Sequence, residues 1–119
     1  MKSDRKGLAR ILFAAKYSMD GLSAAFRSEA AFRQDCLLCA ALFFAAWIPD
    51  VSGGERCALI IPLFALLIAE LLNSAVEKCV DMVSPEFNPL AKFAKDAGSA
   101  AVFVALANIA VCWAAVLIF

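Results

Sequence analysis

The sequence predicts an all-α membrane protein, with an N-terminal amphipathic surface helix followed by three transmembrane helices. The first observation is composition: 64% of the 119 residues are hydrophobic and 18% are charged, whereas soluble domains are about 45–50% apolar. The second is size, because so short a chain has too little interior to hide this excess of apolar side chains. The third is the presence of long apolar segments separated by turn residues. We therefore expect residues 1–119 to form a single membrane domain.

The composition also excludes several classes of function. The chain has no histidine, so Ser-His-Asp catalysis, Cys-His catalysis and a His-ligated metal are impossible. Its net charge is zero, which disfavours nucleic-acid binding by bulk charge. The five cysteines lie in or beside apolar runs and are typical of small buried side chains. Neither the G-x-G-x-x-G motif nor the Walker P-loop is present, so any nucleotide needs a different cradle.

The first element, residues 6–28, has the pattern of an amphipathic helix. Its basic and acidic residues lie mostly away from a stripe of apolar residues at helical spacing. The stripe consists of Leu8, Ile11, Leu12, Ala15, Met19, Leu22 and Phe26. We expect this helix to lie in the membrane interface. The alternative is a helix packed against other helices of the same molecule.

Three predicted spans follow, over residues 29–48, 57–82 and 96–119. The strictly apolar part of the first, residues 36–48, has only 13 residues, so it reaches a spanning length only when extended back to Glu29. Pro49 and Asp50 end it, and a Ser-Gly-Gly turn follows. Two X-Pro pairs, Ser84-Pro85 and Asn88-Pro89, indicate a loop before the third span.

The distribution of basic residues predicts the orientation. They gather before the first span and near the loop between the second and third, whereas the loop between the first two spans has only Arg56. By the positive-inside rule the N-terminus and the 83–94 loop are cytoplasmic, and three spans then place the C-terminus in the periplasm.

A polar stripe runs along the second span. Glu70, Asn73, Ser74, Glu77 and Asp81 fall at i, i+3, i+4, i+7 and i+11, so they share one helix face. A charge inside a membrane costs about 2.5–3.5 kcal/mol on insertion scales, so these groups must face protein, water, metal or substrate. Hydrogen bonding between helices would explain the two small polar residues but not the carboxylates.

The two glutamates of the stripe should differ in role. Glu70 lies about two turns deeper than Glu77, which is about 10 Å along the helix axis. Glu77 can therefore meet a water-soluble phosphate ligand near the interface, while Glu70 can meet a group carried by a lipid.

Two further polar clusters are expected at the same level, one entering the first span (29–35) and one entering the third (95–99). Carboxylates such as Glu29 and Glu77 can hold a divalent cation. Lys95 can offset phosphate charge, and Gly98 permits close approach of helices. The alternative for Lys95 and its neighbour Asp96 is interfacial snorkelling with a charge at the start of the third span.

Taken together, these motifs resemble the bacterial integral-membrane diacylglycerol kinase family over nearly the whole chain. The matching pieces are Glu-Ala-Ala-Phe-Arg-Gln from Glu29, E-x-x-N-S-x-x-E from Glu70 with Asp81, and K-D-x-G-S-A-A from Lys95. The resemblance implies a homotrimer of the inner membrane with active sites between subunits. It also implies transfer of the γ-phosphoryl of Mg-ATP to the hydroxyl of diacylglycerol, giving phosphatidic acid and ADP.

The resemblance further assigns site residues by position. Glu70 matches the general base, and Glu29 and Glu77 match carboxylates that bind Mg²⁺. Nucleotide-contact positions are Arg10, Tyr17, Glu29, Glu77, Glu86, Asn88, Lys95 and Asp96. Lipid-contact positions are Arg10, Ala14, Ala15, Tyr17, Ser18, Ala24, Ala25, Ala31, Phe32, Arg33, Gln34, Asp50, Val51, Arg56, Glu70, Ser99 and Trp113. Asn73, Asp81 and Gly98 have supporting roles.

This chain departs from the family pattern at a few positions. Asp35 stands where glutamate is usual, Phe87 and Asn88 replace a Tyr-His pair, and Lys16 and Met19 replace the commoner Gly and Trp. The loop contacts with nucleotide are therefore open.

Two other functions are compatible with parts of the sequence. An undecaprenol kinase shares the architecture and chemistry, but such relatives usually lack the run that begins at Glu29. A small oligomeric proton or cation conductor would use Glu70 and Glu77 as ion ligands. It does not explain the clusters on the first and third spans.

Overall fold

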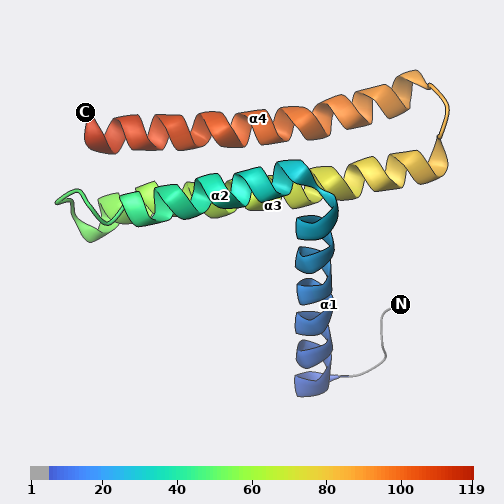
Figure 1. Cartoon of the computed structure of the whole chain (residues 1–119), viewed down its shortest axis with the longest axis horizontal. Coiled ribbons are helices and arrows are strands. Elements are labelled where there is room, and N and C mark those ends of the chain that lie inside the picture. Colours follow the sequence, from blue (N-terminus) through green and yellow to red (C-terminus); the bar gives the residue numbers. More distant parts are fainter. Residues whose placement is uncertain (1–5) are drawn as a thin grey trace.

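The computed structural model describes residues 6–119, which form four α-helices and no strand. The helices are α1 (Gly7–Ser28), α2 (Ala30–Ala45), α3 (Gly53–Val83) and α4 (Pro89–Leu117). Figure 1 shows α2 and α4 running alongside α3, while α1 stands out sideways from the other three. The predicted all-helical class is confirmed.

Helix length separates α2 from its two neighbours. α3 and α4 have 31 and 29 residues, and both are long and apolar enough to cross a membrane. α2 has 16 residues, which gives a rise of about 24 Å against a hydrocarbon core of about 30 Å. α2 and the predicted first span thus end at the same loop, but the regular helix is shorter than the span.

The start of α4 lies earlier than the predicted third span, at Pro89 instead of residue 96. The Asn88 side-chain oxygen accepts hydrogen bonds from the backbone amides of Leu90 at 2.8 Å and Ala91 at 3.4 Å. Proline suits the first helical position, where its missing N–H has no intrahelical partner to lose. The loop therefore runs over residues 84–88, and the second X-Pro pair lies across the start of α4, with Asn88 as the cap and Pro89 as the first helical residue.

Arginine side chains stabilise both corners of the chain. At the α1–α2 corner, Arg33 Nη1 donates to the carbonyls of Phe26 and Arg27 at 2.8 and 3.0 Å, which satisfies acceptors in the last turn of α1. At the α2–α3 loop, the Arg56 guanidinium donates to three carbonyls, those of Ala46, Pro49 and Val51, at 2.7–3.3 Å.

The start of α3 is fixed by a capping box. Ser52 Oγ accepts from the Glu55 amide at 3.1 Å, and the Glu55 carboxylate accepts from the Ser52 amide at 2.9 Å. The Ser-Gly-Gly segment, predicted as a turn, therefore contains the cap and the first residues of α3.

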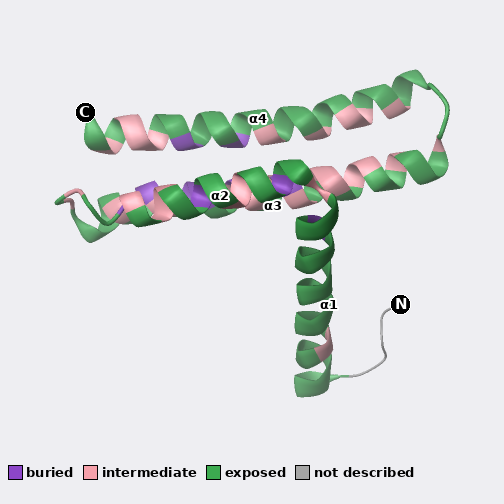
Figure 2. Cartoon of the chain, viewed as in Figure 1, coloured by how far each residue is buried: buried purple, intermediate pink, exposed green. Residues whose placement is uncertain are grey.

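A small apolar core lies where α2, α3 and α4 meet. It consists of Cys39, Leu63, Leu66, Ala105 and Ile109. Figure 2 shows that burial is concentrated between these helices, while most of α1 and the outer face of α4 are exposed. Trp113 Nε1 donates to the Leu59 carbonyl at 3.0 Å and so joins α4 to α3 beside this core.

Candidate active site

Glu70 stands at the centre of the candidate site. It is the buried charged side chain of the described residues, at 6% exposure. Its carboxyl interacts with the Asp35 carboxyl of α2 and with the Asn73 amide one turn further along α3, and it lies within electrostatic range of Glu77. Two helices therefore bring polar groups to one point of a mainly apolar bundle.

Two buried oxygen atoms beside Glu70 have no hydrogen-bond partner in the described part of the chain. They are Asp35 Oδ2 and Asn73 Oδ1. Leaving a buried acceptor unpaired costs about 1–3 kcal/mol, so native structures usually satisfy such groups. A hydroxyl group or a hydrated cation supplies the donor or positive charge that such oxygens need.

Gly98 lets α4 approach α3 beside this centre. A Cβ atom at position 98 would overlap Asn73 Oδ1 and would lie 3.4 Å from Asn73 Cγ. The Asn73 amide therefore lies directly against the α4 backbone, and its orientation depends on the missing side chain of Gly98.

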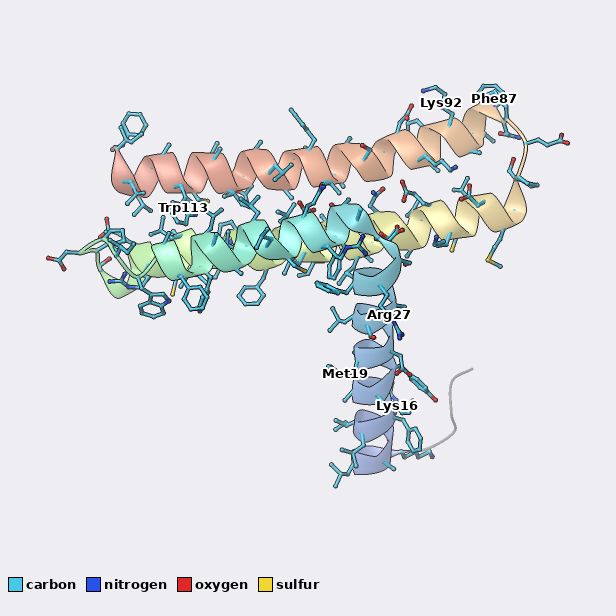
Figure 3. All side chains as sticks on the ribbon, in the orientation of Figure 1. Lys16, Met19, Arg27, Phe87, Lys92 and Trp113 are labelled. Atoms are coloured by element: carbon cyan, nitrogen blue, oxygen red, sulfur yellow. The ribbon has the colours of Figure 1, made fainter. Side chains whose placement is uncertain are left out.

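A cavity of about 440 Å³ with several charged lining residues lies between α3 and α4, next to the loop that joins them. We call it the α3–α4 cavity. Its charged lining consists of Asp81, Glu86, Lys92, Lys95 and Asp96. Lys95 Nζ pairs with Asp81 Oδ1 at 2.7 Å across the two helices, and Lys92 Nζ pairs with Asp96 Oδ2 at 2.6 Å along α4. Figure 3 shows Lys92 and Phe87 at this end of the bundle, opposite Trp113.

A second cavity, of about 560 Å³, lies between α1 and α3. Its lining is mainly apolar but includes Ser18, Ser28 and Glu29 from the α1 side and Ser74 and Lys78 from α3. This α1–α3 cavity joins the predicted Glu29 position to the polar stripe through Ser74.

The structure gathers many of the predicted site residues at these three places. Near the buried centre, Glu70 interacts with Asn73 and Glu77 of its own helix, and Gly98 of α4 lies against Asn73. The α3–α4 cavity is lined by Asp81, Glu86, Asn88, Lys95 and Asp96. Ser18, Ala24, Ala25 and Glu29 line the α1–α3 cavity. Four lipid-contact positions lie near the start of α2: Ala31, Phe32, Arg33 and Gln34, of which Phe32 is buried. Ser99 is exposed and follows Gly98 on α4.

Two other sets lie apart from Glu70 within one chain. Arg10, Ala14, Ala15 and Tyr17 are exposed on the half of α1 that stands away from the bundle. The other set lies near the α2–α3 loop and consists of Asp50, Val51, Arg56 and Trp113. Arg56 is 14 residues before Glu70 on α3, which separates the two by about 21 Å along the helix. The polar groups of Arg56 and Trp113 are bound to backbone carbonyls there.

The donors present suit a hard cation. In the described residues, no three Asp, Glu or Cys side chains converge closely enough to hold a metal ion. The acidic groups of the stripe and Glu29 nevertheless offer carboxylate oxygens, which Mg²⁺ prefers and typically uses one or two at a time beside water and phosphate. Their chemistry therefore fits Mg²⁺ bound together with a nucleotide.

Asp35 and Lys92 lie at the candidate site, although the sequence motifs assigned neither of them to it. Asp35 lies three residues after Phe32 and four before Cys39, and because both of these are buried, helical spacing assigns Asp35 to the inner face of α2. Lys92 lies three residues before Lys95 and four before Asp96. Its cavity position follows once α4 is known to begin at Pro89.

The fold and the site define an integral-membrane helical protein with a buried acidic centre beside a charged cavity. A model of the prokaryotic diacylglycerol kinase family matches residues 16–117. The chain is 56% identical over 112 residues to a diacylglycerol kinase of Pseudomonas aeruginosa, covering 94% of this chain and 91% of that protein. It is 41% identical over 114 residues to a diacylglycerol kinase of Escherichia coli, covering 95% and 93%. A diacylglycerol kinase of Haemophilus influenzae is 38% identical over 113 residues, covering 95% and 96%.

The chain therefore belongs to the prokaryotic diacylglycerol kinase family. Its activity is that of a lipid kinase acting on diacylglycerol.

Proposed function

We propose that the chain transfers the γ-phosphoryl group of Mg-ATP to the free hydroxyl of diacylglycerol at Glu70, producing phosphatidic acid and ADP. The observation that carries this assignment is the burial of Glu70 beside two unpaired acceptors, Asp35 Oδ2 and Asn73 Oδ1. A lipid hydroxyl that enters from the bilayer can donate its proton at this point.

Glu70 acts as the general base in this proposal. It accepts the proton of the lipid hydroxyl, the hydroxyl oxygen forms a bond to the γ-phosphorus, and the bond from that phosphorus to the bridging oxygen breaks as ADP leaves. Asn73 interacts with the Glu70 carboxyl and so orients it. Positioning supplies much of the rate in such transfers, because the phosphoryl group itself needs little covalent help.

The nucleotide occupies the α3–α4 cavity and the adjoining stripe. Lys95 offsets the negative charge of the phosphates, with Glu86, Asn88 and Asp96 as further contacts. Glu29 and Glu77 would hold Mg²⁺, and the bound ion would supply positive charge to offset the negative charge of the phosphates. The capping bonds of Asn88 use its side-chain oxygen, so its amide NH₂ is the group left for a nucleotide.

The lipid enters along the α1–α3 cavity, whose mainly apolar lining suits the glycerol backbone and the first methylenes of diacylglycerol. Ser18, Ala24 and Ala25 lie on this wall, and each has a lipid-contact position in the family pattern. The exposed apolar outer surface around it lets the acyl chains remain in the bilayer.

We further propose that α1 lies in the membrane interface and that α2, α3 and α4 cross the inner membrane. The N-terminus is then cytoplasmic and the C-terminus periplasmic. The working form is a homotrimer. Arg10 and Tyr17 lie on the half of α1 that stands away from the bundle. In the trimer, these residues of one chain would lie beside Glu70 of a neighbouring chain.

The test is transfer of labelled phosphate from ATP to short-chain diacylglycerol by the purified chain in detergent, with and without Mg²⁺. We expect labelled phosphatidic acid in the presence of Mg²⁺ and none after chelation. A parallel reaction with undecaprenol examines the related acceptor. Preferential labelling of undecaprenol would contradict the proposed substrate, and label transfer without any divalent ion would contradict the role of Glu29 and Glu77.

A further inference from the structure

We propose that Lys92 is an additional nucleotide-binding residue, whose ammonium group supplies the second positive charge of the α3–α4 cavity to the phosphates. The inference rests on the proposed function, because it assumes that this cavity receives Mg-ATP. Neither the sequence motifs nor the family pattern assigns a role to Lys92.

Lys92 supplies one of the two positive charges in the cavity lining. The lining has three carboxylates, Asp81, Glu86 and Asp96, against two ammonium groups, Lys92 and Lys95. Without Lys92, a single cation would remain, and that cation is already 2.7 Å from Asp81. A polyphosphate entering so acidic a cavity would be repelled, since like charges at short range oppose binding.

The ammonium group of Lys92 is free to exchange partners. Lysine has three N–H donors, and the bond to Asp96 Oδ2 at 2.6 Å is a single contact. Both side chains of the pair are more than 60% exposed, and exposed pairs of this spacing contribute little to stability. Exchanging the Asp96 carboxylate for a phosphate oxygen as the partner of Lys92 therefore costs little stability.

The position of Lys92 on α4 is unfavourable for the helix by itself. It lies in the first turn, where its amide bonds to the Asn88 carbonyl at 2.9 Å, and this turn has no acidic residue. Helix N-termini favour negative charge, and a lysine four residues before an aspartate is the weaker order of an i,i+4 pair. A bound anion would compensate for both effects.

The first experiment measures steady-state kinetics of the full chain in detergent, with Lys92→Gln compared with the parent. We expect the KM for Mg-ATP to rise about five- to tenfold, with kcat and the KM for diacylglycerol changed less than about twofold. Lys92→Arg retains the charge and should restore the KM. Raising the salt concentration should narrow the difference between Lys92→Gln and the parent, because ions screen exposed charges.

Lys16→Gln is the matched control. Lys16 also pairs with an aspartate four residues ahead, Asp20, at 3.1 Å, and the two pairs have nearly equal exposure. Within one chain it lies on α1, away from the α3–α4 cavity (Figure 3), and, unlike Tyr17, it has no nucleotide-contact position in the family pattern. Its removal should leave the KM for Mg-ATP unchanged; an equal rise in both variants would overturn the inference.

A double variant separates direct contact from positioning of Asp96. If Lys92 binds phosphate itself, Lys92→Gln weakens nucleotide affinity in the Asp96→Asn background as well. Loss of the effect in that background would mean that Lys92 only orients Asp96, and it would contradict the proposal.

Direct binding of a non-hydrolysable Mg-ATP analogue, measured by calorimetry, gives a readout that needs no turnover. A five- to tenfold weaker Kd for Lys92→Gln is expected. If the parent binds the analogue but transfers no phosphate to diacylglycerol, the proposed function is wrong. The Kd values of the parent and Lys92→Gln for the analogue still test the Lys92 inference in that case. An unchanged Kd in an active enzyme overturns the Lys92 inference alone.

Discussion

Glu70 combines burial with an acidic neighbour, and each property restricts what the residue can do. A buried carboxylate needs partners, because transfer from water is costly. Its partners are another carboxyl, from Asp35, and the amide of Asn73, so it lacks the basic partner that a structural ion pair would provide. This arrangement favours a group that handles a proton over one that stabilises the fold.

Replacing Glu70 by glutamine should remove the proposed general base with little change in the shape of the side chain. We expect kcat to fall at least about 10²-fold, the usual contribution of a general base, while the affinity for Mg-ATP stays within about twofold. Phosphate transfer and binding of a non-hydrolysable analogue are the two measurements. Glu55→Gln, the same change at the capping box of the same helix, is the control and should retain activity. Loss of nucleotide binding with turnover preserved would refute the role of Glu70.

Gly98→Ala should disturb the site through Asn73. The new methyl group overlaps the Asn73 side-chain oxygen, so either the amide rotates away from Glu70 or the two helices separate. We expect lower kcat and a loss of stability of about 1–3 kcal/mol, the usual cost of overpacking. Gly54→Ala is the control, because a Cβ at position 54 meets no atom within 4 Å. Thermal unfolding and kcat for both variants test this, and an unaffected Gly98→Ala enzyme would contradict the close helix contact.

At the scale of the elements, the corners of the chain depend on two guanidinium groups that bind backbone carbonyls. Arg33 holds the last turn of α1 to the start of α2, and Arg56 holds the α2–α3 loop. Arg56 also lies 5.0 Å from the ring centre of Trp47, a cation–π distance. Helix ends leave carbonyls without partners, and a guanidinium can satisfy several at once.

Arg56→Ala should therefore loosen the α2–α3 loop. It leaves three carbonyls without their donor, at a cost of about 1–3 kcal/mol since the site is partly buried. We expect a lower midpoint of thermal unfolding, followed by circular dichroism in detergent micelles. Arg27→Ala removes an exposed arginine and should shift the midpoint much less. Equal midpoints for the two variants would show that the loop does not depend on Arg56.

Apolar composition places the starts of both long helices too late. The second and third spans are predicted to begin at residues 57 and 96, whereas α3 begins at Gly53, inside the segment predicted as a turn, and α4 begins at Pro89. The polar stripe follows from periodicity within one helix. The facing of Asp35 and Glu70 depends on how two helices pack, which spacing along a single helix does not contain.

At the scale of the whole molecule, the single chain is open on several sides. Large apolar side chains such as Phe103 and Val104 on α4 are more than 60% exposed, and half of α1 stands clear of the other helices (Figure 2). Lipid and neighbouring copies are the two surroundings that would cover such surfaces in a membrane.

Subunit mixing tests whether α1 and Glu70 of one site come from different copies. Arg10→Ala and Glu70→Gln chains, each expected to be inactive alone, should regain activity when they assemble together. If each site takes α1 and Glu70 from different chains, equal and random mixing restores about a quarter of the sites in a symmetric oligomer. Phosphate transfer after co-refolding into mixed micelles is the measurement. A mixture as inactive as its parents would show that each site is built from one chain.

The unequal lengths of the helices have a consequence for the lipid around them. α2 rises about 24 Å, whereas α3 and α4 rise about 46 and 43 Å from the same end of the bundle. If the three cross together, as proposed, the longer pair projects past the fatty-acyl layer into the headgroup zone, carrying Asp81 and Lys95 with it. The short α2 would be matched by a locally thinner leaflet. The glycerol of a lipid beside α2 would then lie closer to water, where the charged phosphate of the product must be located.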